Sequence, residues 1–213
     1  MALLPATDRR AKKTLPSYAA AGRHLAKADP VMRRIIARVG PCRLKRYPRY
    51  FVTLCDSIVS QQLSSRVAEV IFNRFEALYS RGRLTPQRVA ATPVTRLRTA
   101  GLSGQKARYL KELAKGFARG SIRPHRFARQ PNEEIIETLT AIHGIGRWTA
   151  EMFLMFSLNR LDVLPVDDLG IKKAVRQAYG LRVLPKPETI RRIGRAWHPY
   201  ETIASWYLWR SLR

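Results

Sequence analysis

The stretch that most constrains the fold runs over residues 132–157, where two helical patterns meet at a pair of glycines. Apolar residues recur at helical spacing on both sides of these glycines: Ile135, Ile136, Leu139 and Ile142 before them, then Trp148, Met152, Phe153 and Phe156. Asn132 is placed to cap the first helix, and Gly144 and Gly146 allow a tight turn. The pattern predicts a helix, a hairpin and a second helix, with N–H groups at the hairpin suited to a phosphate.

Basic residues outnumber acidic residues along the whole chain. Lys and Arg together number 40 against 15 for Asp and Glu, which gives a formal net charge of +25 and a pI of about 11.3. A surface this basic attracts polyanions, of which nucleic acid is the commonest in a cell. Because a ribosomal or nucleoid structural protein would share this charge, the charge indicates the class of partner and not the chemistry.

The cysteine content and the hydropathy exclude several other classes of protein. Cys42 and Cys55 lie in no metal-ligand spacing, so neither a zinc site nor an iron–sulfur cluster is expected. No apolar run approaches the ~18–20 residues that cross a bilayer, and the N-terminus lacks the hydrophobic core of a signal peptide. We therefore expect a soluble, cytoplasmic protein with no membrane partner.

The rest of the chain carries helical patterns and no convincing run of alternating residues, so we expect an all-α fold. Residues 1–15 show no helical stripe and are expected to form a mobile basic tail, followed by one domain over residues 16–213. Further helices are predicted over 17–39 with a break at Pro30 capped by Asp29, over 48–60, and after Ser64 with Val67, Val70, Ile71, Phe75 and Leu78 inward. Helices are also predicted after Thr85-Pro86 and Thr92-Pro93, over 103–120, from Asp167 or Asp168 to Tyr179, and over 187–197 and 199–212.

Three ordered motifs resemble a known family. They are Ile58-Val59-Ser60-Gln61-Gln62-Leu63-Ser64, Gly101-Leu102-Ser103-Gly104-Gln105-Lys106-Ala107, and Ile142-x-Gly144-Ile145-Gly146-Arg147-Trp148-Thr149-Ala150 with Asp168 downstream. Together they resemble the helix-hairpin-helix DNA glycosylases, and most closely the 3-methyladenine DNA glycosylase II (AlkA-like) branch. The resemblance implies two packed helical lobes with a cleft between them, in a short form without the additional N-terminal sheet domain of larger relatives.

Asp168 is the candidate catalytic residue. By position alone an aspartate at a helix start is usually a cap, in a place where the helix dipole favours an anion. The resemblance aligns the family's catalytic carboxylate with Asp168 and leaves Asp167 as the less favoured candidate. Hydrolysis of an N-glycosidic bond makes the sugar oxocarbenium-like, and one carboxylate can stabilise that charge or activate water. A methylated, cationic base leaves without a strong acid.

The resemblance also implies a substrate pocket. Strand-cutting relatives carry a lysine where this chain has Trp148, so we expect a monofunctional enzyme without lyase activity. The resemblance places Trp148 in the substrate pocket, together with Tyr200, Trp197 and Gln61. Trp206 and Trp209 are interpreted as core residues. Gln62, with Leu63 beside it, is implied as the wedge that fills the gap left by a flipped base. The alternative is that Gln61 and Gln62 merely cap the break between two helices.

The hairpin is implied to grip the DNA backbone. The implied phosphate-binding residues are Gly144, Ile145, Gly146, Arg147, Thr149 and Lys106. Relatives bind a sodium or potassium ion through hairpin carbonyls, which here are those of Thr140, Ile142 and Ile145. His143 stands where the family often has proline, and we expect it to face the surface or a phosphate.

The sequence thus predicts a DNA glycosylase of base excision repair that removes alkylated bases such as 3-methyladenine and 7-methylguanine after base flipping. The expected partner is double-stranded DNA with damaged bases, and we expect a monomer that needs no catalytic cofactor. Two alternatives remain open: a non-catalytic helix-hairpin-helix DNA-binding protein, and a glycosylase for oxidised or mismatched bases. The range of alkylated bases is not determined by the sequence.

Overall fold

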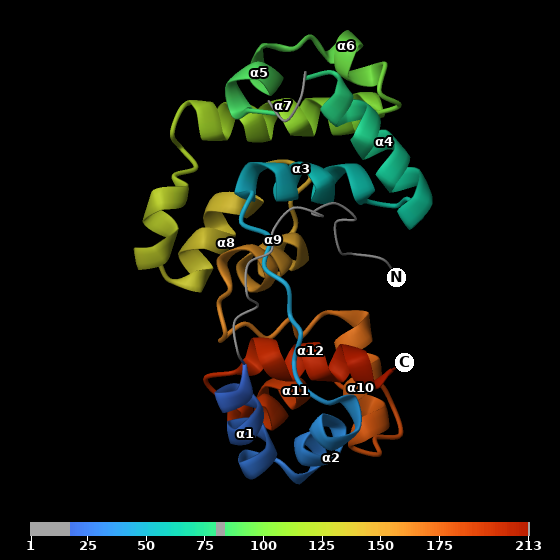
Figure 1. Cartoon of the computed structure of the whole chain (residues 1–213), viewed down its shortest axis with the longest axis vertical. Helices are drawn as coiled ribbons and strands as arrows, with labels where there is room; N and C mark the ends of the chain where they lie inside the picture. The colour runs from blue at the N-terminus through green and yellow to red at the C-terminus, as the bar shows by residue number, and fades with distance from the viewer. Residues whose placement is uncertain (1–17, 80–83, 213) are drawn as a thin grey trace. The chain divides into compact units, whose positions relative to one another are not determined.

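The structure is a computed structural model that describes residues 18–79 and 84–212. The predicted basic tail, residues 1–15, lies outside the described residues. Every regular element in the described ranges is helical (Figure 1), which confirms the prediction of an all-α fold. Within these ranges, no helix is both long and apolar enough to cross a membrane.

The described residues form two compact units. The first consists of residues 47–153, and the second combines residues 18–46 with residues 154–212. The chain therefore enters the second unit, leaves it for the first, and returns to it after helix α9. Each unit has its own apolar core and is described by itself.

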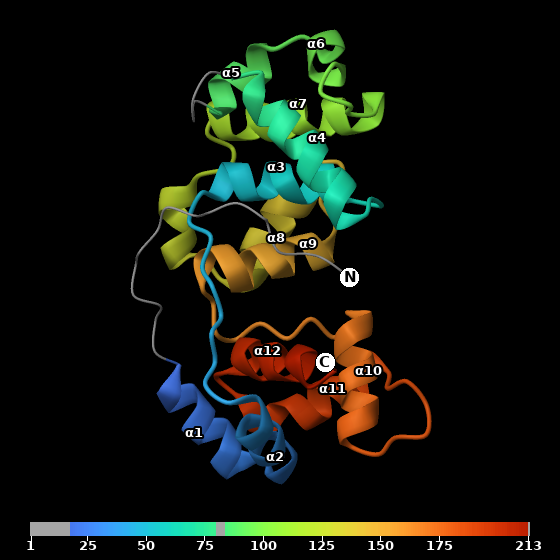
Figure 2. The ribbon, with the colours of Figure 1, turned by 45° about the vertical axis from the view of Figure 1, so that its right-hand side comes forward.

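In the first unit, helix α3 is the central element. Its bounds and those of the other helices are α3 (Tyr50–Ser60), α4 (Ser65–Ala77), α5 (Pro86–Ala91), α6 (Val94–Arg98), α7 (Gly104–Ala118), the 3-10 helix η1 (Pro124–Arg129), α8 (Asn132–Thr140) and α9 (Arg147–Phe153). Helix α3 lies between α7 on one side and the α8–α9 pair on the other (Figures 1 and 2). It buries Phe51, Leu54, Cys55, Ile58 and Val59, as their spacing predicts.

The inward face of α4 differs from the predicted one. Val67 and Val70 are 44% and 43% exposed, whereas Ala68, Phe72 and Phe75 are buried. Both sets of residues recur at helical spacing, so the pattern alone allowed either face. Phe75 is buried as predicted and packs against Phe72 and Tyr79, whereas the prediction was wrong at Val67 and Val70.

Two predicted helix caps were also wrong. Asn132 is the first residue of α8 and makes no capping hydrogen bond, because the helix starts after Pro131. Thr92 does not cap α6, since its hydroxyl donates to the Arg88 carbonyl at 2.8 Å. The caps next to Pro30 and Pro86 are confirmed: Asp29 accepts from the Val31 N–H at 2.8 Å, and Thr85 accepts from the Arg88 N–H.

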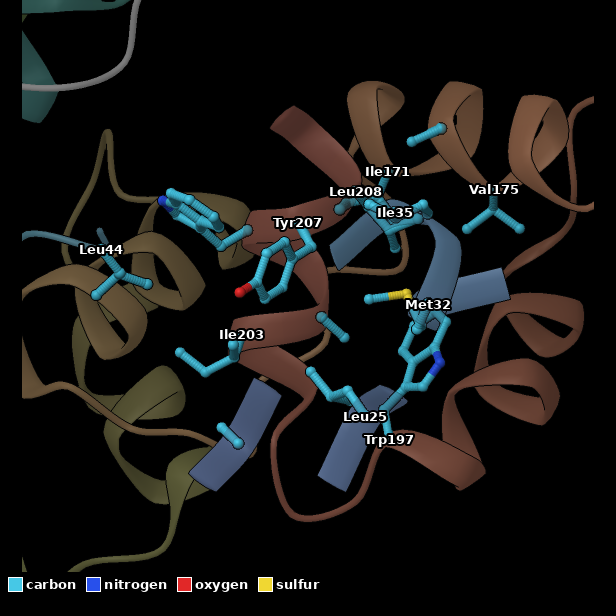
Figure 3. Packing of buried hydrophobic residues seen from close by; sticks show 14 of the residues in the cluster. Leu25, Met32, Ile35, Leu44, Ile171, Val175, Trp197, Ile203, Tyr207 and Leu208 are labelled. Carbon is cyan, nitrogen blue, oxygen red and sulfur yellow. The ribbon is translucent and has the colours of Figure 1, made fainter. Parts of the chain in front are cut away.

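The second unit packs around α12. Its elements are α1 (Ala19–Ala28), α2 (Pro30–Val39), the π-helical turn η2 (Leu154–Leu158), α10 (Leu169–Ala178), α11 (Pro187–Gly194), the 3-10 helix η3 (Arg195–Trp197) and α12 (Glu201–Ser211). Ile203, Tyr207 and Leu208 of α12 lie among side chains of α1, α2 and α10 in one apolar cluster (Figure 3). The π-helical turn directly continues α9 and was not predicted.

Asp29 joins three segments inside this second core. One carboxylate oxygen caps α2, while the other accepts hydrogen bonds from the Tyr179 hydroxyl and from the Trp197 indole N–H, the latter at 3.0 Å. A buried carboxylate is stable only when its oxygens are bonded in this way. Burial raises the pKa of the Tyr179 hydroxyl, and the hydrogen bond to the Asp29 carboxylate raises it further.

Candidate active site and nucleic-acid interface

Asp168 lies at the N-terminus of α10 and is half-buried. Its Oδ1 accepts a hydrogen bond from the Ile171 N–H at 2.8 Å, so the carboxylate caps the helix. Asp167, by contrast, is exposed and pairs with Lys172 at 3.1 Å. The two adjacent acids therefore have different environments, and Asp168 is the one held in a defined orientation.

Trp209 holds the same carboxylate from the last helix. Its indole Nε1–H donates to Asp168 Oδ1 at 2.9 Å. The ring stacks on Phe156 of the π-helical turn, with centroids 6.1 Å apart and planes 28° apart. Gly170 leaves the space for this arrangement, because a Cβ there would meet Asp168 Oδ1 at 2.9 Å and the Trp209 indole at 3.0 Å.

Sequence reasoning assigned Trp209 to the core and missed this contact. Trp209 is half-buried and follows Asp168 by 41 positions, so no local pattern connects the two residues. A π-helical turn is often found at functional sites, but its presence is not readable from the apolar spacing that predicts α9. Only the folded chain shows that α10, α12 and the π-helical turn meet at this carboxylate.

The two predicted pocket aromatics of the second unit, Tyr200 and Trp197, differ in accessibility. Tyr200 is half-buried just before α12, with its ring edge-on to His24 at a centroid distance of 5.2 Å. Trp197 is 0% exposed and lies beside Leu25 and Met32 in the core (Figure 3). A fully buried ring cannot stack on a substrate, so the prediction that Trp197 lines the pocket was wrong.

The predicted hairpin is present in the first unit, between α8 and α9. Gly144 has a φ of +85°, the left-handed region that favours glycine, and the turn closes through the Ile145 N–H and the Ile142 carbonyl at 3.1 Å. The side chains of Ile145 and Thr149 are buried, at 3% and 7% exposure. A phosphate could therefore reach only the backbone of these two residues, and the Ile145 N–H is already bonded to the Ile142 carbonyl. Trp148 is the second residue of α9 and is half-buried.

The Arg147 side chain is exposed and forms ion pairs with carboxylates of α8 and α9. Its guanidinium forms a bidentate ion pair with Glu133 at the start of α8, in which Nη1 donates to Glu133 Oε2 at 2.9 Å. Its Nε donates to Glu151 Oε1 at 3.2 Å. These carboxylates raise the pKa of Arg147, and Arg147 lowers the pKa of Glu133. These ion pairs compete with the predicted contact between Arg147 and the DNA backbone, which stays a prediction.

Lys106 is likewise engaged with the protein. Its Nζ donates to the carbonyls of Val59 and Gln61, each at 2.7 Å, at the end of α3. Partial burial lowers the pKa of this lysine. Two of its three N–H groups therefore point at carbonyl oxygens of the protein, and these bonds compete with the predicted phosphate contact.

The turn that carries the predicted wedge follows directly. The Gln61 side chain donates from Nε2 to the Gly144 carbonyl at 2.6 Å, so it is tied to the hairpin rather than directed at a substrate. Gln62 is exposed and has a φ of +57°, which is uncommon for a residue other than glycine. Leu63 beside it is 37% exposed. The turn thus presents Gln62 and Leu63 outward while Gln61 anchors it.

The hairpin carbonyls predicted to hold a monovalent cation have suitable chemistry. Carbonyl oxygens are the ligands that hard cations take, and the Ile142 carbonyl keeps a second lone pair beside its bond to the Ile145 N–H. His143 is exposed as expected, and its ring and backbone N–H both contact Glu112, with Nδ1 at 3.0 Å. Among the described residues, no group of three His, Cys, Asp or Glu side chains could hold a metal ion.

The sequence-predicted residues are distributed over the two units. The first holds the hairpin and the turn after α3, that is Gln61, Gln62, Leu63, Lys106, Thr140, Ile142, Gly144, Ile145, Gly146, Arg147, Trp148 and Thr149. The second holds Asp168, Trp197 and Tyr200, together with Trp209. Within the first unit, a chain of hydrogen bonds links the turn, α7 and the hairpin, and within the second, Asp168 and Trp209 are in direct contact.

The sequence of the chain matches a known protein family and several of its named members. Residues 55–199 match the model of the HhH-GPD superfamily base excision DNA repair proteins. The chain is 38% identical over 193 residues to DNA-3-methyladenine glycosylase 1 of Schizosaccharomyces pombe, which covers 88% of this chain and 85% of the relative.

Solved structures agree with the sequence match. A complex of the Schizosaccharomyces pombe 3-methyladenine DNA glycosylase with abasic DNA superimposes with a TM-score of 0.77 at 38% identity, covering 90% of this chain and 96% of that one. The DNA-3-methyladenine glycosidase of Bacillus halodurans superimposes with a TM-score of 0.84 at 35% identity, covering 92% and 91%. The chain belongs to the HhH-GPD superfamily of base excision DNA repair proteins.

Proposed function

We propose that this protein is a monofunctional DNA glycosylase that hydrolyses the N-glycosidic bond of alkylated bases in base excision repair. The observation that carries the proposal is the Asp168 carboxylate, held by the Ile171 N–H and the Trp209 indole at a helix start in a chain of this family. Relatives named DNA-3-methyladenine glycosylase support alkylated purines, such as 3-methyladenine and 7-methylguanine, as the substrate class.

The chemistry assigned to Asp168 is electrostatic. As the base leaves, positive charge develops on the deoxyribose, and a carboxylate beside it stabilises that charge or orients and deprotonates the attacking water. The two N–H donors on Oδ1 fix the direction of the carboxylate before substrate binds. An alkylated base already carries positive charge, so it leaves without a second carboxyl group acting as acid, unlike the leaving group of an ordinary glycosidase.

Aromatic residues are the proposed contacts for the flipped base. An electron-rich ring attracts a cationic base through its face, and Trp148 and Tyr200 are the half-buried candidates. Trp148 stands where strand-cutting relatives place a lysine, and an indole cannot form the Schiff base that strand cleavage requires. We therefore propose that the product is an abasic site in an uncut strand.

The proposed grip on DNA combines the hairpin, the wedge and the overall charge. The backbone N–H groups of Gly144 and Gly146 would contact a phosphate, and the exposed Gln62, with its φ of +57°, would fill the space of the flipped nucleotide. The carbonyls of Thr140, Ile142 and Ile145 would hold a sodium or potassium ion, which supplies positive charge beside that phosphate. A net charge of +25 supplies the nonspecific attraction. We further propose that the protein acts as a monomer in the cytoplasm.

The test is incubation with duplexes that each hold one lesion: 3-methyladenine, 7-methylguanine, hypoxanthine, ethenoadenine, 1-methyladenine, 3-methylcytosine or 8-oxoguanine. Release of free base is measured, and strand breaks are scored with and without alkali. We expect release of alkylated bases with breaks only after alkali, and no adduct trapped by borohydride. Binding without release would favour a non-catalytic DNA-binding protein, and release of 8-oxoguanine alone would favour a glycosylase for oxidised bases.

The catalytic assignment has its own variant. Asp168→Asn keeps an oxygen that can cap α10 and accept from Trp209, but it removes the negative charge. We expect it to melt and bind DNA like the unmodified protein while its excision rate falls at least about a hundredfold. Full activity of this variant would refute the role of Asp168, whatever the substrate proves to be.

A further inference from the structure

The turn after α3 is held from two sides by hydrogen bonds to backbone carbonyls. From α7, the Lys106 Nζ donates at 2.7 Å to Val59 and at 2.7 Å to Gln61. From the turn itself, the Gln61 Nε2 donates at 2.6 Å to the Gly144 carbonyl in the hairpin. Gln61 is therefore the residue at which the end of α3, the start of α7 and the hairpin meet.

The Lys106 ammonium suits the end of α3. The last carbonyls of a helix have no intrahelical partner and carry partial negative charge, so a positively charged donor satisfies and stabilises them. The backbone at Lys106 is held as well, because Ser103 caps the start of α7 by accepting from the Lys106 backbone N–H at 3.2 Å. A lysine held at both ends in this way has a fixed rather than a mobile charge.

The hairpin end of the connection is equally constrained. Gly144 lies against the Tyr109 ring of α7, and the Tyr109 hydroxyl accepts from the Gln105 side chain at 2.6 Å. The Gly144 carbonyl that receives Gln61 therefore cannot shift freely with respect to α7. The turn, α7 and the hairpin form one closed set of contacts within the first unit.

Gln62 follows this anchored residue directly, with a left-handed backbone conformation and an exposed side chain. We propose that Lys106 is a positioning residue for base flipping: through Gln61 it locks the wedge turn to the hairpin, and it contacts no phosphate. This inference rests on the proposed function, since it assigns Gln62 to the duplex. It predicts that loss of Lys106 slows the entry of Gln62 without weakening the electrostatic attraction to DNA.

The first measurement separates a positioning lysine from a phosphate-binding one. Lys106→Met keeps the length of the side chain and removes its charge, and Lys115→Met is the matched control at an exposed position of the same helix. Each phosphate contact contributes about −0.9 to the slope of log K against log salt for undamaged duplex. We expect Lys106→Met to change this slope no more than Lys115→Met does. A decrease of about 0.9 in the magnitude of this slope for Lys106→Met, without a similar decrease for Lys115→Met, would overturn the proposal.

The second measurement concerns the wedge. Single-turnover release of 7-methylguanine is compared between a fully paired duplex and one in which the lesion lies opposite an abasic site, where little unpairing is needed. Because two hydrogen bonds from a charged donor are lost, we expect Lys106→Met to be at least about tenfold slower on the paired duplex and nearly unchanged on the other. Equal losses on both substrates, or no loss on either, would contradict the positioning role.

A third readout does not depend on catalysis. Insertion of the wedge is followed by the fluorescence of 2-aminopurine placed opposite a tetrahydrofuran abasic analogue, with melting curves to verify folding. Gln61→Met, which removes the bond to Gly144 and keeps Lys106, is expected to share the reduced fluorescence change of Lys106→Met. If the unmodified protein releases no base but gives the fluorescence change, the proposed function fails and the positioning role stands. If both variants give the same fluorescence change as the unmodified protein, the positioning role is refuted and the proposed function is not affected.

Discussion

Gly144 is the position at which a single methyl group is expected to disturb the hairpin most. Its φ of +85° is disfavoured for any residue with a Cβ, which costs about 1–2 kcal/mol for alanine. The added Cβ would also overlap the Tyr109 ring, since even Cε2 and Cγ would lie only 2.8 Å away. Relieving such an overlap in a packed region costs about 1–3 kcal/mol more. Gly144→Ala should therefore destabilise the protein by about 2–5 kcal/mol.

Gly146 provides the control within the same hairpin. It has no positive φ, and a Cβ added there would have no atom within 4 Å. Gly146→Ala is thus expected to change stability by less than about 0.5 kcal/mol. Thermal melting followed by circular dichroism measures both variants, and the melting temperature of Gly144→Ala should fall by about 5–15 °C. A fall of less than 2 °C would refute the reasoning.

The two contributions to this cost can be separated. Tyr109→Ala removes the ring that the new methyl group would strike and leaves the backbone conformation of the hairpin as the remaining cost. In that background, Gly144→Ala should cost only about 1–2 kcal/mol. If the cost is the same with and without the Tyr109 ring, the close approach of Gly144 to α7 does not constrain the hairpin.

Three further predictions concern individual side chains. Trp209→Phe keeps a ring against Phe156 but loses the N–H donor to Asp168. The single-turnover excision rate should therefore fall about ten- to a hundredfold while DNA affinity stays unchanged. An equal effect from Trp206→Phe would contradict this prediction. Gln62→Ala should reduce 2-aminopurine fluorescence in lesion duplexes more than it reduces affinity, and equal losses would count against the wedge. Burial raises the pKa of Asp56 from 3.8 to about 6. The contribution of Asp56 to the free energy of unfolding is therefore fully present below about pH 4, where the carboxyl is protonated, and is lost as the pH rises through 6. The free energy of unfolding of Asp56→Asn, measured in urea, should therefore rise by about 1–3 kcal/mol relative to that of the unmodified protein between pH 4.5 and pH 7.5. A difference between the two proteins that does not change with pH would refute the reasoning.

The helices were predictable from the sequence where the signals are local. A cap followed by proline marks a helix start within two residues, and Asp29 and Thr85 behave accordingly. The buried face of α3 could be read in the same way, because large apolar residues occupy only one side of it. In α4 the two candidate faces differ by one position, and the choice between Val67 and Ala68 depends on neighbouring helices that no local pattern describes.

The candidate site was predictable to a smaller extent, for a related physical reason. Motif spacing located Asp168, the hairpin and the turn after α3, but the role of each side chain depends on its distant partners. Lys106 bonds to a carbonyl 47 positions away, and Arg147 pairs with a carboxylate 14 positions away. A basic residue beside a phosphate-binding motif therefore suggests a DNA contact until the fold shows an internal partner.

These internal partners also bear on how the protein would hold DNA. The two basic side chains within the motifs, Lys106 and Arg147, both bond to other groups of the protein, whereas the hairpin offers backbone groups with no net charge. Neutral amide contacts release few counterions, so they position the duplex with little dependence on salt, and the salt-dependent attraction must arise from other basic residues of this highly charged chain. Placement and attraction are then separable properties: changes at the hairpin should alter where the duplex sits, and changes at dispersed basic residues should alter how strongly it is attracted.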